Sequence, residues 1–423
     1  MPDIQKPEIK AGLNSFSYWW EDLNIRVNVN RLDEDGKGEV SVWYENGDER
    51  RLLLMKNANL LSSTACSTLC KQLVKHLELD WDTVLTYVTA LTMDALRQGE
   101  PVRKVGIQPA DSTIQYILSP LLEENQPTTI YGPGSSAKSY FADYIACLVQ
   151  FGEFGLNGLL VPEVGNVLYL DWETCFEDHQ RRVWFIKRGL GIETEECFFY
   201  RFCAQSLSND IYSIQKIVTD EKIALVIVDS QMAAANNGPD QAANANQYYN
   251  ALRSLRCTTL TIDHVNKVDW KGSEQQESTG PYGSVVKYNR SRAQFEIKKS
   301  QGAGEQTVEL SIIHRKNNNG RLLKPFGVRL KFIDNQMNHL DNVVFESCDV
   351  TDNPELAKTL SIPDRILAIL KASREPMTAQ SIGERMEKDT ASIRVRLNEL
   401  KTRNIVSSRE VGKDVFWAMV YHE

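Results

Sequence analysis

The stretch Thr129-Ile-Tyr-Gly-Pro-Gly-Ser-Ser-Ala-Lys-Ser139 decides how the fold of this chain is interpreted. It follows a short apolar run typical of a buried strand and precedes a helical pattern over residues 140–150. A strand, a glycine-containing loop and a Lys-Ser pair at the start of a helix together indicate a phosphate-binding loop. The backbone N–H groups of such a loop and of the helix N-terminus surround the phosphates of a nucleotide.

Each position in this loop has an expected task. Lys138 would reach the β- and γ-phosphates, and the hydroxyl of Ser139 would ligate Mg²⁺. Ala137 stands where the pattern G-x-x-x-x-G-K-[ST] has glycine, so its Cβ can crowd the phosphates or restrict the backbone. The plainer alternative is a glycine-serine turn before a helix. The expected nucleotide-binding residues of the loop are Gly132, Pro133, Gly134, Ser135, Ser136, Ala137, Lys138, Ser139 and Tyr140.

The pattern of apolar and polar residues around this loop predicts an α/β domain over residues 101–348. Short apolar runs alternate with helical patterns, which indicates parallel βαβ units with helices on both faces of the sheet. From residue 293 to residue 345 the pattern changes to hairpins, an antiparallel extension that is common in large α/β folds. The predicted parallel strands lie at residues 128–131, 167–170, 224–228 and 260–262.

Acidic residues follow two of these strands. Asp229 ends the run 223–229, where it would lie beside the phosphate loop and hold Mg²⁺ through water or through Ser139. Asp171 and Glu173 are two residues apart, so both project to one face. We expect Glu173 to position and deprotonate the attacking water and Asp171 to support or cap the turn. A turn aspartate and a helix N-terminal glutamate are the structural alternatives.

His264 follows the strand at 260–262, together with Asp263 and Asn266. This position suits a group that senses whether a γ-phosphate is present. A purely structural histidine is an equal alternative.

Smaller units flank the α/β domain. Residues 24–55 alternate and carry Asp-Gly and Asn-Gly turns, and helical patterns follow at 63–77 and 81–97, which predicts an α+β module over residues 1–100. Three helical patterns and a hairpin over residues 360–423 predict a winged helix. Its expected DNA contacts are Arg394 and Arg396 in the major groove and Lys413 on the wing. A protein-binding winged helix with a solvated basic face is the alternative.

Composition limits the function classes further. The 423 residues are 42% hydrophobic and 25% charged, which excludes a disordered or collagen-like chain. The net charge of −8 argues against a basic nucleic-acid coat, although residues 362–423 hold eleven Lys or Arg against nine Asp or Glu. There is no apolar run long enough to cross a membrane and no Cys-x-x-Cys pair, so we expect reduced thiols, a cytoplasmic location and no membrane partner.

The motifs together resemble a known family. Gly132–Ser139, Asp171–Glu173, Val228–Ser230 and Asp263–Lys267 are similar to those of the RecA/DnaB-type P-loop ATPases, in particular the RepA-like branch of plasmid and phage replicative helicases. The resemblance covers about residues 105–345. It implies a RecA-like core, ATP and Mg²⁺ as cofactors, and a homo-oligomeric ring, often a hexamer, with nucleotide between subunits. By resemblance, Lys316 reaches the γ-phosphate of a neighbour, with Arg315 as the second candidate and ordinary solvated charges as the alternative.

The resemblance also implies DNA as a partner, single-stranded in the ring and double-stranded at the winged helix, with other replication proteins as further partners. The corresponding DNA-contacting loops are residues 231–247, which have no Lys or Arg, and residues 268–284, which have only Lys271. That is less basic than a translocating channel requires. The leading hypothesis is a Mg²⁺-dependent ATPase acting as a replicative helicase or helicase-like factor of a phage, plasmid or other mobile element. The alternatives are an ATP-gated DNA-binding regulator with little or no hydrolysis, and a metabolite kinase, which leaves the winged helix unexplained.

Overall fold

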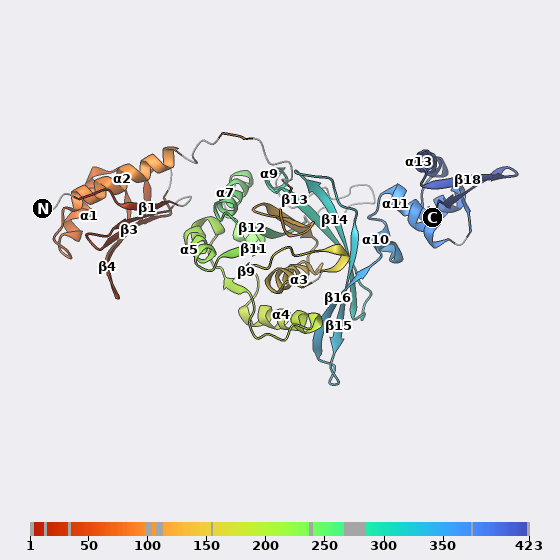
Figure 1. Cartoon of the computed structure of the whole chain (residues 1–423), viewed down its shortest axis with the longest axis horizontal. Coiled ribbons are helices and arrows are strands. Elements are labelled where there is room, and N and C mark those ends of the chain that lie inside the picture. The colour runs from red at the N-terminus through yellow and green to blue at the C-terminus, as the bar shows by residue number, and fades with distance from the viewer. Residues whose placement is uncertain are drawn as a thin grey trace.

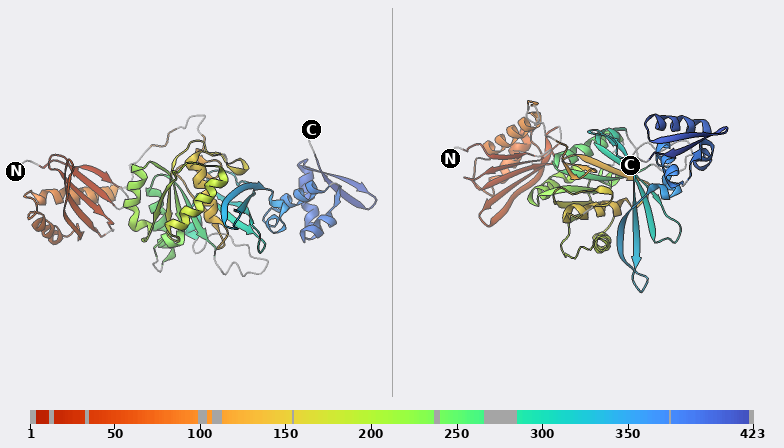
Figure 2. Two further views of the ribbon diagram at one scale, coloured as in Figure 1. Left: turned by 90° about the horizontal axis from the view of Figure 1, so that it is seen from below. Right: turned by 45° about the vertical axis from the view of Figure 1, so that its right-hand side comes forward.

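Three units follow one another along the chain and lie in a row (Figures 1 and 2). None of the helices in the described ranges is long and apolar enough to cross a membrane. The computed structural model describes residues 4–11, 15–32, 35–98, 104–106, 113–153, 155–236, 240–265, 285–373 and 375–420.

The N-terminal unit is an antiparallel sheet of five strands in sequential order, with two helices. Its core forms because alternate residues such as Tyr18, Val27 and Val42 point to one face and pack against Trp81 and other residues of the helices. The sequence predicted only the last three strands. The elements are β1 (Glu8–Ala11), β2 (Phe16–Trp20), β3 (Ile25–Asn30), β4 (Lys37–Asn46), β5 (Glu49–Asn59), α1 (Ser63–Leu73) and α2 (Trp81–Gln98).

The tryptophans of this unit divide between its core and its surface. Trp20 is buried and its Nε1 donates to the carbonyl of Gln5 at 2.8 Å. Trp19 and Trp43 are half-buried and lie under the guanidinium groups of Arg26 and Arg50, at 4.6 and 4.4 Å. Of these three tryptophans, only Trp20 is part of the core.

The central unit confirms the predicted α/β fold. Its nine-stranded sheet has the order β10-β9-β11-β12-β8-β13-β14-β15-β16, parallel from β10 to β13 and antiparallel beyond. Within the parallel part, the inner strands β8, β9, β11 and β12 are almost entirely buried because helices cover them on both faces, whereas the edge strand β10 is partly exposed. The strands of the parallel part are β8 (Pro127–Gly132), β9 (Asn166–Asp171), β10 (Phe199–Phe202), β11 (Ile223–Asp229), β12 (Thr258–His264) and β13 (Ala293–Ser300).

The antiparallel extension and the helices complete this unit. The β15–β16 hairpin projects away from the sheet (Figure 1). The extension consists of β14 (Thr307–Asn317), β15 (Phe326–Asp334) and β16 (Leu340–Cys348). The helices are α3 (Lys138–Phe151), η1 (Leu156–Gly158), α4 (Phe176–Leu190), α5 (Leu207–Asp220), α6 (Gln231–Ala234), α7 (Gln241–Ser254) and α9 (Val285–Arg290).

Two segments whose proline-rich or polar composition is typical of linkers contain ordered structure. The proline-rich stretch before β8 holds a small hairpin of β6 (Tyr116–Leu118) and β7 (Leu122–Glu123). The polar stretch after β16 holds η2 (Val350–Asp352) and α10 (Pro354–Ala357), which packs beside β13. Residues 349–360 are therefore not a plain linker despite their polar composition, because the apolar side chain of Leu356 is buried.

The C-terminal unit contains three helices and a three-stranded sheet of order β17-β19-β18. Its core includes Ile366, Ile382, Leu397 and Trp417. Val395 on the third helix is 55% exposed, because it lies away from the inward positions 393, 397 and 400. The elements are α11 (Ile362–Ala372), β17 (Met377–Thr378), α12 (Ala379–Met386), α13 (Thr390–Thr402), β18 (Val406–Val411) and β19 (Asp414–Met419).

Candidate functional site

The phosphate loop joins the end of β8 to the start of α3. Gly132 is required by space, since a Cβ there would lie 2.5 Å from the carbonyl oxygen of Ile297 on β13. Ala137 has φ +59° and ψ +24°, the left-handed conformation that glycine adopts at no steric cost. The backbone of the loop thus keeps a glycine-like shape despite the alanine, at the cost of local strain.

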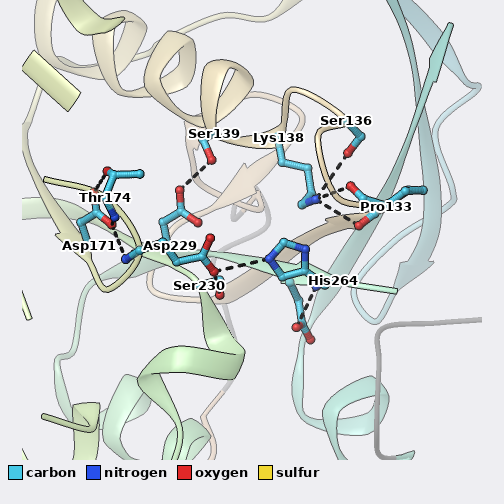
Figure 3. Close-up of polar contacts among 12 residues, drawn as sticks. Pro133, Ser136, Lys138, Ser139, Asp171, Thr174, Asp229, Ser230 and His264 are labelled. Atoms are coloured by element: carbon cyan, nitrogen blue, oxygen red, sulfur yellow. Dashed lines mark hydrogen bonds and ion pairs between the residues drawn. The ribbon is translucent and has the colours of Figure 1, made fainter. Parts of the chain in front are cut away.

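Lys138 is folded back onto its own loop (Figure 3). Its Nζ donates to the carbonyls of Gly132 and Pro133 at 3.0 and 2.7 Å and lies 3.4 Å from Oγ of Ser136. The side chain is buried, and this burial lowers the pKa of Lys138 to about 8, although nearby carboxylates oppose the shift. An arriving phosphate would replace the carbonyl oxygens as acceptors of these hydrogen bonds.

Ser139 and Asp229 meet at the carboxyl end of the sheet. Oγ of Ser139 donates to Oδ2 of Asp229 at 2.7 Å, and the hydroxyl of Tyr169 donates to the same oxygen at 2.8 Å. Burial raises the pKa of Asp229. A hydroxyl and a carboxylate are ligands that suit Mg²⁺, which fills its remaining positions with water and substrate phosphates. In the described part of the chain no cluster of three or more His, Cys, Asp or Glu could hold a metal alone.

Glu173 faces this pair from the loop after β9. Its Oε1 accepts a hydrogen bond from Oγ of Ser230 and lies 3.4 Å from Nε2 of His264. The contact with His264 is the main cause that lowers the pKa of Glu173, so the carboxylate is ionised at neutral pH. An ionised, part-exposed carboxylate bordering the cleft can accept a proton from a bound water.

Asp171 has the supporting role that the sequence suggested. It is 1% exposed and accepts hydrogen bonds from the backbone N–H groups of Glu173 and Thr174, at 2.8 and 3.0 Å. The hydroxyls of Thr174 and Tyr200 also donate to it. Its acceptor positions are therefore used to shape the turn that presents Glu173, and Figure 3 shows Asp171 beside Thr174 of this turn.

These residues border one cleft of about 590 Å³. Within it the structure brings together the predicted loop residues Ser135 to Tyr140 with Glu173, Asp229 and His264. The far wall comes from the end of β13, the turn that follows it and the antiparallel strands β14 and β15, and Lys299 on β13 donates to the carbonyl of Ser135 at 3.1 Å. The other residues of this wall are Gln301, Glu305, Gln306, Val308 and Phe332.

Lys316 lies away from this cleft. In the sheet, Gln294 on β13 pairs with Lys316 on β14 on one side and with Thr129 on β8 on the other. Lys316 is therefore at the level of Thr129, three residues before the phosphate loop begins. Its Nζ donates to the carbonyls of Asn289 and Ser291 at 3.2 and 2.6 Å, and to that of Tyr288. Burial lowers the pKa of Lys316. This geometry separates Lys316 from the nucleotide cleft of its own chain.

The remaining predicted residues belong to the expected DNA contacts. Arg394 is exposed on α13, and Arg396 beside it pairs with Glu399 at 2.8 Å. Lys413 is exposed at the turn between β18 and β19. Lys271 lies outside the described residues. Arg315, the second candidate for the trans contact, is bound to Glu296 at 2.7 Å.

Sequence reasoning missed three polar residues beside the phosphate loop. Asp143 on α3 is fully buried and pairs with Arg182 on α4, and the same guanidinium lies 3.1 Å from Nδ1 of His179. A signal was present, since His179 and Arg182 are three apart and share the helix face that carries the buried Val183 and Ile186. The second signal was Asp143, an aspartate that stands among apolar residues about one turn after the Lys138-Ser139 pair.

The sheet topology, the loop and the carboxylates give the central unit the geometry of an α/β domain with a phosphate-binding loop. In agreement, residues 96–269, less than half of the chain, match the family model described as an AAA domain. The chain is also similar to the crystal structure of a KaiC-like protein from the hyperthermophilic archaeon Pyrococcus horikoshii OT3. That similarity has 14% sequence identity and a TM-score of 0.37, and it covers 58% of this chain and 99% of the other. No curated protein matches the sequence.

Proposed function

We propose that this chain is a Mg²⁺-dependent ATPase that assembles into a ring, often a hexamer in proteins of this type, and acts on DNA. Its role would be that of a replicative helicase or helicase-like factor of a phage, plasmid or other mobile element, working in the cytoplasm with other replication proteins. The observation that carries the ATPase part is the contact of Ser139 with Asp229 at 2.7 Å, with Glu173 on the same cleft.

The residues suggest how hydrolysis would proceed. Lys138 would exchange its carbonyl acceptors for the β- and γ-phosphate oxygens of ATP, and Ser139 and Asp229 would hold Mg²⁺. The metal supplies charge that stabilises the departing diphosphate. Glu173 would take a proton from the water that attacks the γ-phosphorus, giving ADP and inorganic phosphate. His264 is in contact with Glu173. It would therefore be suited to sense whether the γ-phosphate of ATP is still present or has been released.

The assembly part of the proposal rests on Lys316. Because it is level with Thr129 and separated from its own cleft, a phosphate contact by Lys316 would be with the nucleotide of a neighbouring chain. The ammonium would have to leave the carbonyls at the end of α9 to make it. That requirement links the arrangement of α9 to the neighbour's nucleotide.

A subunit-mixing experiment tests both parts. Lys138→Ala and Lys316→Ala chains are each expected to lose ATP turnover, because one lacks the phosphate contact and the other the trans contact. Mixing them should restore some interfaces with both lysines intact, measured as ATPase activity beside the mass in solution. Stable mixed rings without recovery would contradict the trans role, and full activity of Lys138→Ala would contradict the site.

DNA contact is proposed at the C-terminal unit, interpreted as a winged helix. Its support is the exposure of Arg394 on α13 and of Lys413 at the hairpin turn. In the described residues of the first expected DNA loop, 231–236 and 240–247, there is no Lys or Arg. The alternative function, a nucleotide-gated DNA-binding regulator, would show DNA affinity that changes with ATP while turnover stays at background.

A further inference from the structure

Arg182 occupies an unusual place for a charged residue in the middle of a helix. Its side chain is only 15% exposed, and it lines the nucleotide cleft beside Ser139, Tyr140 and Glu173. Its guanidinium carbon lies 5.7 Å from the centre of the Tyr140 ring. The exposed part of Arg182 therefore faces the space in which a nucleotide would lie.

Two buried residues hold this guanidinium in place. Nε of Arg182 donates to Oδ2 of Asp143, which is fully buried on α3. Nη2 lies 3.1 Å from Nδ1 of His179. Burial and the neighbouring Arg182 lower the pKa of His179 to about 3, so its ring is neutral and its Nδ1 accepts the hydrogen bond. The network orients Arg182 without adding a competing positive charge.

The network leaves part of Arg182 unused. A guanidinium has five N–H donors, and the contacts to Asp143 and His179 account for two of them. Nη1 makes no hydrogen bond with the residues that the structure describes. A structural ion pair alone would not require a border on the cleft. Guanidinium groups bind phosphate oxygens in a fork geometry.

We propose that Arg182 is a nucleotide ligand in cis, whose free N–H groups donate to the phosphate chain bound by Lys138 and Ser139. Asp143 and His179 are positioning residues for it. The proposal rests on the proposed function, since it assumes that the cleft takes ATP. It differs from the trans contact of Lys316, because Arg182 belongs to the same chain as the loop and acts before any ring forms.

Binding of MgATP and MgADP by titration calorimetry tests the proposal in the full-length chain. Arg182→Ala should weaken both nucleotides by about tenfold, because one charge-assisted hydrogen bond is lost. Arg181→Ala is the matched control, since Arg181 is 63% exposed and its ion pair is with Asp178. It should change neither affinity.

Removing Arg182 alone leaves Asp143 buried without its partner, which can prevent folding. The double variant Arg182→Met/Asp143→Leu removes the pair together and should show the same loss of nucleotide affinity with an unchanged melting temperature. Arg182→Lys should recover part of the affinity. If the folded double variant binds both nucleotides as tightly as the natural chain, Arg182 is not a ligand. If the natural chain itself does not bind MgATP, the proposed function fails instead.

Discussion

Replacing Ala137 by glycine tests whether the loop is already shaped for phosphates. Ala137 lies at φ +59°, where a residue with a Cβ is less stable than glycine by about 1–2 kcal/mol. Glycine has more conformational freedom in the unfolded chain, and this lowers the stability of the variant by about 0.4–1 kcal/mol. Removing the partly buried methyl group costs the variant roughly half of the ~0.8 kcal/mol that burying a methylene contributes.

These opposing contributions leave a net gain of roughly 0.5 kcal/mol for Ala137→Gly, or a rise in melting temperature of about 1–2 °C. The expected effect on ATP affinity is smaller than about threefold. The loop holds the left-handed conformation in the empty protein, so the strain is present before and after binding and cancels in the affinity.

Thermal unfolding and titration calorimetry with MgATP measure the two effects side by side. A gain in ATP affinity of tenfold or more, about 1.4 kcal/mol, would show that the methyl group crowds the phosphates and would refute the reasoning. Two other loop glycines provide controls for stability. Gly134→Ala should be tolerated, because a Cβ there meets nothing within 4 Å. Gly132→Ala should be destabilising, because its Cβ would lie 2.5 Å from a carbonyl oxygen.

The further predictions concern three residues. Glu173→Gln should keep MgATP binding while lowering turnover about 10²–10⁴-fold, measured by phosphate release; unchanged turnover would remove Glu173 from the role of base. Because Lys138 has a pKa of about 8, ATP affinity should fall by up to about tenfold per pH unit above 8, and a flat calorimetric profile from pH 7 to 9.5 would contradict this. The contribution of Lys138 to stability has the opposite sign and rises with pH between about 8 and 10.5, since the unfolded chain then binds the extra proton. Arg394→Ala should weaken duplex DNA binding by about 1–3 kcal/mol in a mobility-shift assay, whereas Lys71→Ala on α1 should not; equal loss in both would point to non-specific charge.

The sequence was most informative where local chemistry and local structure coincide. The loop 132–139 and the acids after β9 and β11 could be placed because each follows a continuous apolar strand. Strand β10 was missed, since its four residues Phe-Tyr-Arg-Phe lie at the edge of the sheet and are not fully buried. Its pairing with β9 depends on contacts distant in sequence, which no local pattern records.

The polar residues around the site were predictable only in part. Glu173 and Asp229 stand at strand ends, where parallel topology gathers functional groups. Arg182 stands in a helix beside a second arginine, and helical spacing puts Arg182 on the inward face and Arg181 on the exposed face. Only the packing of α4 against α3 and the sheet shows that this inward face borders the cleft. Similarly, the backbone partners of Lys316 come from α9 and could not be inferred from its own hairpin.

The packed segment between the central and C-terminal units limits how far the C-terminal unit can move. Thr359 is hydrogen-bonded to Ser311 on β14 at 3.0 Å, and Ser361 caps α11 by accepting from the backbone N–H of Asp364. Leu360 alone stands between these two fixed points, so the joint spans about 7 Å. The C-terminal unit is thus connected to the central unit through a short joint. If the C-terminal unit binds duplex DNA as proposed, the short joint would keep that DNA close to the central sheet. Lengthening the joint would lower the effective concentration of the bound DNA near the sheet without altering either surface.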